Sequence, residues 1–204
     1  MKNPAALRVL ATAALAGALL AASAVAEAAD APVPHYVLDP AKSTLEFTFT
    51  QAGAQNKGHF GRFAVSFDFS PATLAASRLE VTVEVGSLDT GDEERDGTLR
   101  GADLFAVAKF PQAHYLATQI TRTAAGFEAL GKLTLRGVTR DVRVPFTFRT
   151  ATENGNAVGY MSGRTTVARL DFGVGQGDWK ATDQVGNEVG VSFALRLTAA
   201  PAKP

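Results

Sequence analysis

The chain has 204 residues, with 20 basic and 20 acidic side chains and a formal net charge of zero at pH 7. This balance, without any cluster of Lys and Arg, excludes the electrostatic footprint of a nucleic-acid-binding protein. The absence of cysteine excludes disulfides, thiol chemistry, haem attachment through Cys and Cys-based metal sites.

The first residues have the three-part pattern of a secretory signal peptide. Two basic residues precede an uncharged run over 9–22, and an Ala-x-Ala pattern ends at Ala26. The run is shorter than the roughly 20 residues that a membrane-spanning helix needs, although an uncleaved N-terminal anchor is the alternative. We therefore predict a cleaved signal peptide over 1–26, and export of the mature chain to the periplasm. The remainder, 27–204, is predicted to be one soluble domain with its core at about 35–199.

Alternation of apolar and polar residues dominates the rest of the chain and predicts β-strands. Leu45, Phe47 and Phe49, for example, share one face of their run, while Thr and Glu occupy the other face. Turn residues such as those at 56–58 separate the runs, and Pro145 predicts a bulge or a strand end because it cannot donate to a ladder. The alternating runs lie at about 44–50, 63–69, 79–85, 127–135, 142–148 and 189–197, with weaker ones at about 113–121 and 158–169.

One segment interrupts the alternation after the third strand. Thr90 and Glu93 have the spacing of a capping box, with acidic residues in the first turn, which predicts a short helix at about 92–100. Leu104 and Phe105 follow it and would be poor surface residues, so we expect this segment to cover one barrel opening as a lid. The predicted fold is all-β: an eight-stranded antiparallel lipocalin-like barrel with a short helical insertion.

A barrel of eight strands either packs solid or holds one small ligand. The inward faces are almost wholly aliphatic or Phe, which fits an apolar cavity wall, but a packed hydrophobic core would give the same pattern. The residues predicted to form the cavity wall and lid are Phe47, Phe49, Phe63, Phe67, Val81, Val83, Leu99, Leu104, Phe105, Tyr115, Leu133, Phe146, Phe148, Met161, Trp179, Val191 and Phe193.

Sequence blocks across about 160 residues carry a family resemblance. They read YVLD at 36–39, GHFGRF at 58–63, RDGTLR at 95–100, KFP at 109–111, GKLTLRGVTR at 131–140 and ARLDFG at 168–173. In this order they resemble the YceI-like family of periplasmic isoprenoid- and lipid-binding proteins. The resemblance implies a lipocalin-like barrel with a tube-like pocket for an isoprenoid or fatty-acyl chain.

Some relatives in that family are encoded beside, or fused to, a cytochrome b561 membrane protein. Isoprenoid quinones are therefore candidate ligands, a cytochrome b561-type protein is a candidate partner, and a homodimer is a further expectation from relatives. Two positions depart from the family pattern. Gln51 stands where many relatives have His, so a polar role is not carried over to it, and Leu104-Phe105 replaces a pair of Phe.

Patterns typical of catalysis or metal binding are absent from the sequence. His35, His59 and His114 are scattered, and the acidic run over 89–96 does not have the spacing of an EF-hand loop. The glycine-rich stretch at 173–177 lacks the Lys-Ser/Thr of a phosphate-binding loop, and there is no Gly-x-Ser-x-Gly elbow. We predict no metal site, no cofactor and no enzymatic activity.

Three functional hypotheses follow. The first is a periplasmic carrier that sequesters a long-chain amphiphile, such as a polyisoprenoid, an isoprenoid quinone or a fatty-acyl compound, inside the barrel. The alternative is a solidly packed stress-related or structural barrel that acts through surface protein contacts. A third hypothesis, an enzyme acting on an isoprenoid, would need polar groups such as His59, Asp96 and Arg100 at the pocket mouth.

Overall fold

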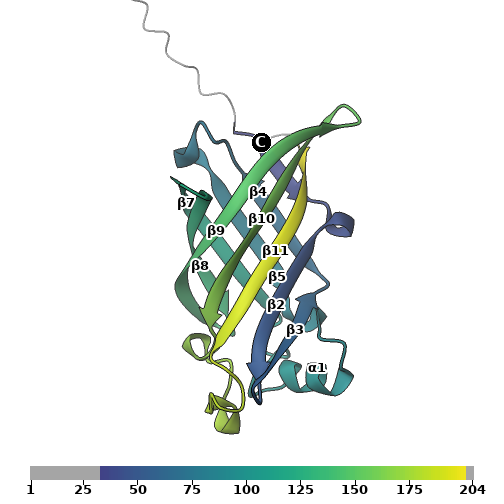
Figure 1. Ribbon diagram of the computed structural model, residues 1–204, viewed down its shortest axis with the longest axis vertical. Helices are drawn as coiled ribbons and strands as arrows, with labels where there is room; N and C mark the ends of the chain where they lie inside the picture. The colour runs from purple at the N-terminus through teal and green to yellow at the C-terminus, as the bar shows by residue number, and fades with distance from the viewer. Residues whose placement is uncertain (1–32, 201–204) are drawn as a thin grey trace, which may run out of the picture. The chain divides into compact units, whose positions relative to one another are not determined.

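The alternating runs form antiparallel strands in the computed structural model, which describes residues 33–200 (Figure 1). The signal peptide predicted over 1–26 lies outside the described residues. The strands of the described part are β1 (His35–Leu38), β2 (Thr44–Gln51), β3 (Ala54–Phe60), β4 (Phe63–Asp68), β5 (Arg78–Glu84), β6 (Leu88–Asp89), β7 (Gln112–Thr123), β8 (Gly126–Leu135), β9 (Val138–Glu153), β10 (Asn156–Ala168) and β11 (Glu188–Ala200).

Bends divide three of the long strands in two, so the 11 strands of the described sheet occupy eight positions around one barrel. β1 and β2 lie end to end along β11, which pairs with β1 near Leu197 and with β2 near Val191. β3 and β4 likewise form one strand position, because β2 pairs with β3 and β1 pairs with β4. β5 and β6 form the next position, because β4 pairs with β5 and β3 pairs with β6. The β1–β11 pairing closes the ring. The predicted eight-stranded antiparallel barrel is confirmed.

The helical insertion lies between β6 and β7, after the third strand position, as predicted. Its N-cap differs from the prediction: the Asp92 carboxylate accepts a hydrogen bond from the Arg95 backbone N–H at 3.0 Å. Thr90 is not the cap: its hydroxyl donates to Asp96 at 2.6 Å and accepts from the Arg95 Nε–H at 2.9 Å. The helices of the described part are α1 (Glu93–Arg100) and the short 3-10 helices η1 (Pro40–Lys42), η2 (Leu74–Ala76), η3 (Val85–Ser87), η4 (Arg169–Phe172) and η5 (Gly177–Lys180).

The prediction of a turn at 56–58 is wrong, because these residues lie within β3 and pair with β2. Gly58 stands opposite Phe47, and a Cβ built on it would lie 2.5 Å from the Phe47 Cζ atom. Glycine at this position therefore allows an aromatic ring to approach the backbone closely, a need that sequence alone does not distinguish from a turn.

Pro145 produces neither the expected bulge nor a strand end. β9 runs through it, opposite Glu128 of β8, without a change of register. β9 pairs with β10 only from Phe146 onward, so Pro145 lies just beyond that ladder and its missing N–H breaks no bond to β10. The bulge is instead in β7, between Ala117 and Gln119.

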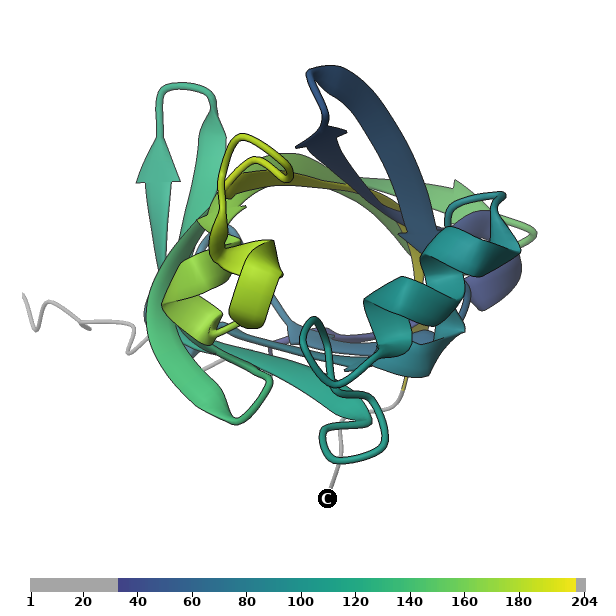
Figure 2. The same cartoon turned by 90° about the horizontal axis from the view of Figure 1, so that it is seen from below.

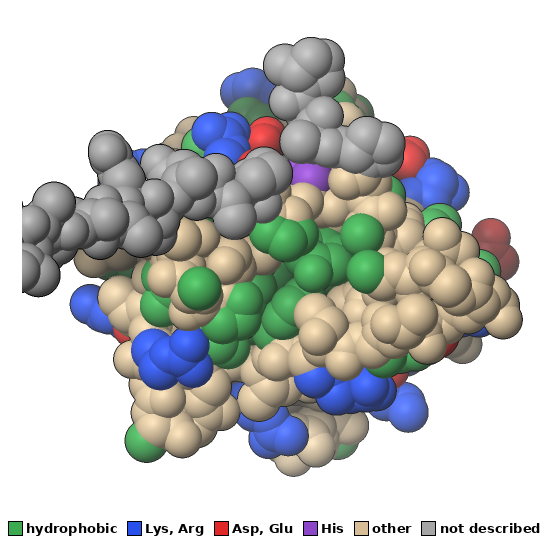
Figure 3. Space-filling view, turned by 90° about the horizontal axis from the view of Figure 1, so that it is seen from above, with side chains coloured by type: hydrophobic (Ala, Val, Ile, Leu, Met, Phe, Trp, Pro, Cys, Tyr) green, Lys and Arg blue, Asp and Glu red, His purple; other side chains and the backbone are tan. Residues whose placement is uncertain are grey.

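Aromatic rings fill one end of the barrel. Phe67 and Phe69 are 0% and 1% exposed, and their ring centroids are 4.8 Å apart. Phe127 stands edge-on to Phe69 at 4.9 Å. This end lies opposite α1 (Figure 1), and a view onto it shows hydrophobic side chains gathered at its centre (Figure 3). We call the cluster the aromatic plug; its members are Tyr36, Phe67, Phe69, Phe127, Phe146 and Phe148.

Candidate functional site

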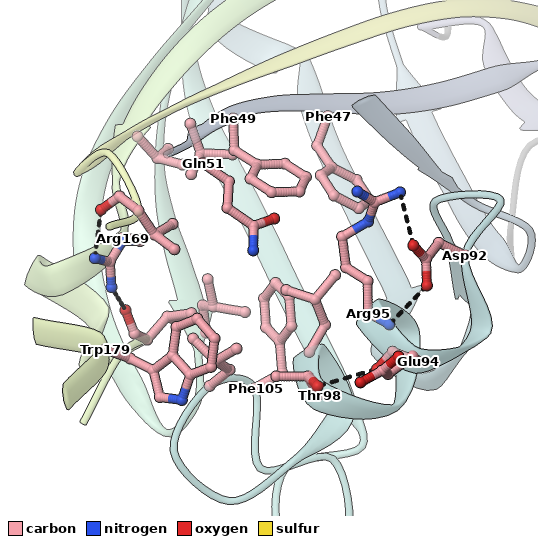
Figure 4. Close-up of a pocket in the computed structure, with 17 residues that line it drawn as sticks. Phe47, Phe49, Gln51, Asp92, Glu94, Arg95, Thr98, Phe105, Arg169 and Trp179 are labelled. Atoms are coloured by element: carbon pink, nitrogen blue, oxygen red, sulfur yellow. Dashed lines mark hydrogen bonds and ion pairs between the residues drawn. The ribbon is translucent and has the colours of Figure 1, made fainter. Parts of the chain in front are cut away.

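A cavity of about 500 Å³ opens at the barrel end opposite the aromatic plug. We call it the mouth cavity. Seen from below, this end is bordered by α1 on one side and by the η4–η5 segment on the other (Figure 2). Figure 4 shows the side chains around it. They are Phe47, Phe49, Gln51, Asp92, Glu94, Arg95, Thr98, Leu99, Leu104, Phe105, Leu135, Val167, Arg169, Val174, Trp179, Val185 and Val189.

A second cavity of about 200 Å³, the deep cavity, adjoins the first and shares five lining residues with it: Phe47, Phe105, Leu135, Val167 and Val189. Tyr115 and Thr165 are its only lining residues with a polar side-chain group. The Tyr115 hydroxyl lies 3.1 Å from two backbone carbonyl oxygens, and burial raises its pKa, so it stays neutral and already bonded. The remaining lining is apolar: Leu45, Phe47, Phe60, Phe63, Val65, Leu79, Val81, Val83, Val85, Phe105, Ala113, Leu133, Leu135, Val142, Val144, Met161, Val167, Val189, Val191, Phe193 and Leu195.

Most of the residues predicted for the cavity wall and lid border one of these two spaces. The structure places Phe47, Phe49, Leu99, Leu104, Phe105 and Trp179 at the mouth cavity. It places Phe63, Val81, Val83, Tyr115, Leu133, Met161, Val191 and Phe193 at the deep cavity.

Three predicted wall residues border neither the mouth cavity nor the deep cavity. Phe67, Phe146 and Phe148 belong to the aromatic plug, where the Phe67 ring meets the other two edge to face at 5.9 and 5.6 Å. The alternation correctly predicts that these side chains point inward. It does not show that rings from several strands meet and fill that end of the barrel. The barrel interior is therefore packed at one end and hollow at the other.

Arg169 organises the segment that borders the mouth cavity opposite α1. It is 4% exposed and donates to the carbonyl oxygens of Val174, Val185 and Gly186 at 2.9, 2.7 and 3.0 Å. No ion pair joins it to a carboxylate in the described part of the chain. Burial of the charge lowers the pKa of Arg169. The guanidinium thus serves to hold together two loop segments that carry wall residues of the mouth cavity.

The same loop requires a glycine beside that guanidinium. Gly175 has φ +117°, and a Cβ built on it would lie 1.9 Å from Arg169 Nη1. The sequence shows only a glycine-rich stretch here, without any sign of the arginine that it surrounds.

On the other side of the mouth, polar groups hold α1 to the barrel. Arg95 donates to Thr90 Oγ1 and to Asn56 Oδ1, both at 2.9 Å. Arg100 donates to the Gly86 and Leu88 carbonyl oxygens. These bonds tie the helix to β3 and to the η3–β6 segment, so α1 is a fixed border of the mouth cavity.

None of the polar residues considered for a catalytic site borders the mouth cavity, although Asp96 and Arg100 lie 3.9 Å apart on α1. Asp96 is 6% exposed and accepts from the Thr90 backbone N–H and hydroxyl, and Arg100 is committed to backbone carbonyls. His59 lies on β3 opposite Glu46 and does not border the cavity. Within residues 33–200, no group of three or more His, Asp or Glu side chains is placed to hold a metal ion.

Sequence reasoning missed several residues of the mouth cavity. Gln51 continues the inward series of Phe47 and Phe49, so its parity could have identified it. Val174 and Val185 belong to loops without periodicity, and only the fold brings them to the cavity. Among the described helices, none has the length and hydropathy required to cross a membrane.

Comparison with known proteins places this geometry among related barrels. BcnA of Burkholderia cenocepacia has a TM-score of 0.71 and 33% identity, covering 78% of this chain and 98% of BcnA. The YCEI protein of Campylobacter jejuni, with a TM-score of 0.64 and 21% identity, shares the fold over 72% of this chain and 86% of its own. A polyisoprenoid-binding domain from Saccharophagus degradans has a TM-score of 0.60 and 17% identity, covering 83% of this chain and 100% of the domain.

Sequence comparison leads to the same group. A UPF0312 protein of Yersinia pestis (strain Pestoides F) is 41% identical over 85 residues, which are 42% of this chain and 44% of the relative. The match thus spans less than half the length of that curated relative. The model of the YceI-like domain matches residues 36–197, nearly the whole described barrel. The chain therefore belongs to the YceI-like family.

Proposed function

We propose that this protein is a periplasmic carrier that binds one long-chain amphiphile, with the tail in the deep cavity and the head at the mouth cavity. The observation that carries the proposal is a blind tube whose inner part is lined by aliphatic and Phe side chains and whose outer part has a polar border. Ligand pockets of about 300–1,000 Å³ with such a lining are typical of small-molecule sites.

The hydrophobic effect supplies the driving force. Each buried methylene contributes about 0.8 kcal/mol, so a tail of ten methylenes contributes on the order of 8 kcal/mol before ordering costs. The polyisoprenoid-binding domain from Saccharophagus degradans supports a polyisoprenoid as one ligand class. An isoprenoid quinone and a fatty-acyl compound have tails that are likewise long and apolar. A cytochrome b561-type partner and a homodimer stay predictions.

The side chains of the mouth cavity favour ligand binding without catalysis. Its two guanidinium groups are occupied by protein acceptors, and its carboxylates, Asp92 and Glu94, lie exposed on the α1 side. A packed barrel acting only through its surface is disfavoured by the two cavities, because the aromatic plug fills one end alone.

Filling the deep cavity tests the proposal. Val81→Phe with Val191→Phe adds two rings to the deep cavity, and we expect the affinity for a fluorescent polyprenol to fall at least tenfold. The delipidated protein should bind about one probe per chain, measured by titration. Val37→Phe, at a β1 position that is 36% exposed, is the matched control and should bind as the wild type does.

Equal binding by the filled and wild-type proteins would remove the deep cavity as the tail site. Circular dichroism and the unfolding midpoint of the double variant show whether the fold is kept. Native mass spectrometry of freshly purified protein adds an independent readout, because a carrier should retain lipid mass that a packed barrel would not.

A further inference from the structure

Gln51 directs an amide into the mouth cavity. It ends β2, and its backbone is fixed on both sides, by pairing with Ala54 of β3 and by a bridge to Val185. Since Phe47 and Phe49 point inward, the two-residue period of a strand turns Gln51 inward as well. Figure 4 shows its side chain reaching into the cavity from the side of Phe49, toward Phe105.

The Gln51 amide has no hydrogen-bond partner within residues 33–200. No side-chain hydrogen bond joins it to another residue of the described chain, although it is half-buried among aromatic side chains. A carboxamide offers two donors and one acceptor. When a ligand displaces water from the mouth cavity, an amide left without a partner would cost binding free energy. A ligand whose head group hydrogen-bonds to Gln51 avoids that cost.

The charges around the mouth cavity disfavour an anionic head group. Arg95 already donates to Thr90 and Asn56, and Arg169 donates to three backbone carbonyls. The other charged lining residues, Asp92 and Glu94, are carboxylates. A charged head group of either sign would lose hydration here: an anion would find both guanidinium groups already donating to protein oxygens, and a cation would lie beside two guanidinium charges.

We infer that Gln51 is the residue that recognises the ligand head group, and that this group is neutral and hydrogen-bonding: a hydroxyl, a carbonyl or an amide. The inference rests on the proposed function, since it assumes a tail in the deep cavity. It adds the chemical class of the head, which the apolar lining leaves open.

The test uses probes that share one 18-carbon monounsaturated tail and differ only at the head. These are oleyl alcohol, oleamide, oleate, oleylamine and, as the tail without a head, 1-octadecene. Trp179 is the only tryptophan of the chain and lies at the mouth cavity, so its fluorescence reports binding. At pH 8, we expect the alcohol and the amide to bind about fivefold more tightly than the octadecene, and oleate and oleylamine to bind more weakly than either.

Gln51→Leu removes the amide while keeping a side chain of similar size. We expect this variant to lose the fivefold preference, about 1 kcal/mol at 1.4 kcal/mol per tenfold, while its affinity for octadecene stays within twofold of wild type. Gln51→Asn should restore part of the preference. Gln119→Leu, at an exposed position on β7, is the matched control and should keep the full preference.

The outcomes separate the two proposals. Failure of every probe to bind wild-type protein would overturn both. Tail binding with no dependence on the head, or with oleate or oleylamine bound most tightly, would overturn the inference and leave the carrier function standing. Equal loss of octadecene and oleamide in Gln51→Leu would show a structural role for Gln51 and would also overturn the inference.

Discussion

At the scale of single residues, the pairing of Arg169 with Gly175 explains why a buried charge is tolerated beside an apolar cavity. Three backbone carbonyls replace water around the guanidinium, and the loop closes tightly enough that only glycine fits at position 175. The arginine holds the loop, and the loop in turn supplies Val174 and Trp179 to the mouth cavity.

Gly175→Ala is therefore expected to destabilise the protein by about 2–3 kcal/mol, since the methyl group adds a clash with Arg169 to the strain of a positive φ. Chemical denaturation measures the change. Gly155→Ala is the control, because Gly155 also has a positive φ (+78°) but a Cβ built on it would have nothing within 4 Å. Its cost should be about 1 kcal/mol, and equal costs for the two variants would contradict a steric role for Arg169.

The sequence predicts only in part which residues line a cavity. Inward direction follows from the two-residue period, as Phe47 and Phe67 both show. Whether an inward ring borders a void depends on the partners that it meets across the barrel. Phe67 meets Phe69, Phe146 and Phe148 and is fully buried, whereas Phe47 borders both cavities.

At the scale of elements, α1 shows how a correct prediction can rest on the wrong residue. The sequence predicts a helix over about 92–100, and α1 spans Glu93–Arg100. The cap is Asp92, because a side chain directly before the first turn reaches the Arg95 N–H while Thr90 is held by Asp96. Sequence spacing alone allowed either residue.

Replacing the cap gives a local test. Asp92→Ala should lower stability by about 1 kcal/mol, because an N-terminal N–H of α1 loses its acceptor. Asp92→Ser keeps a capping oxygen and should recover most of the loss, as judged from denaturation midpoints. Hydrogen exchange should show the loosening confined to α1, and exchange that rises across the whole barrel would contradict a local capping role.

Strands were more predictable than the bends that divide them. The alternation near 44–50 and 189–197 marked β2 and β11, because each has one face toward the interior. The alternation does not reveal β3, because Gly58 within it is equally typical of a turn. It also gave no sign that η1 separates β1 from β2 while both remain paired with β11.

At the scale of the whole molecule, a polar cluster joins segments that meet where the barrel closes. Arg196 of β11 donates to Asp39, which follows β1, at 2.5 Å and to Glu153 of β9 at 2.6 Å. Tyr160 of β10 also donates to Glu153. The hydrogen bond from Tyr160, followed by the one from Arg196, holds the pKa of Glu153 below its ordinary value.

This cluster predicts a loss of stability in acid. A pKa that is lower in the folded than in the unfolded state means that the Glu153 carboxylate stabilises the fold above its unfolded pKa, near 4.5. That contribution disappears as the pH falls through the folded pKa. Glu80 and Glu84 also have lowered pKa values, owing to hydrogen bonds from His114 and Arg62, and act in the same direction.

Denaturation midpoints measured between pH 7 and pH 3 check this expectation. The wild-type midpoint should fall with pH, and Glu153→Gln should start lower at pH 7 and fall less steeply. Glu188→Gln changes an exposed carboxylate that has no ion pair in the described part of the chain, and it should keep the wild-type slope. An unchanged slope for Glu153→Gln would show that the cluster does not couple protonation to folding.

The aromatic plug has a consequence for how a ligand would enter and leave the barrel. Under the proposed carrier function, a ligand enters and leaves through the mouth cavity, with its tail first on entry and its head first on exit, because the plug closes the other end. One bound ligand therefore has to leave before another can enter. The plug also limits the length of tail that the proposed site can enclose, because the part of a longer chain that exceeds the hollow interior remains outside the barrel.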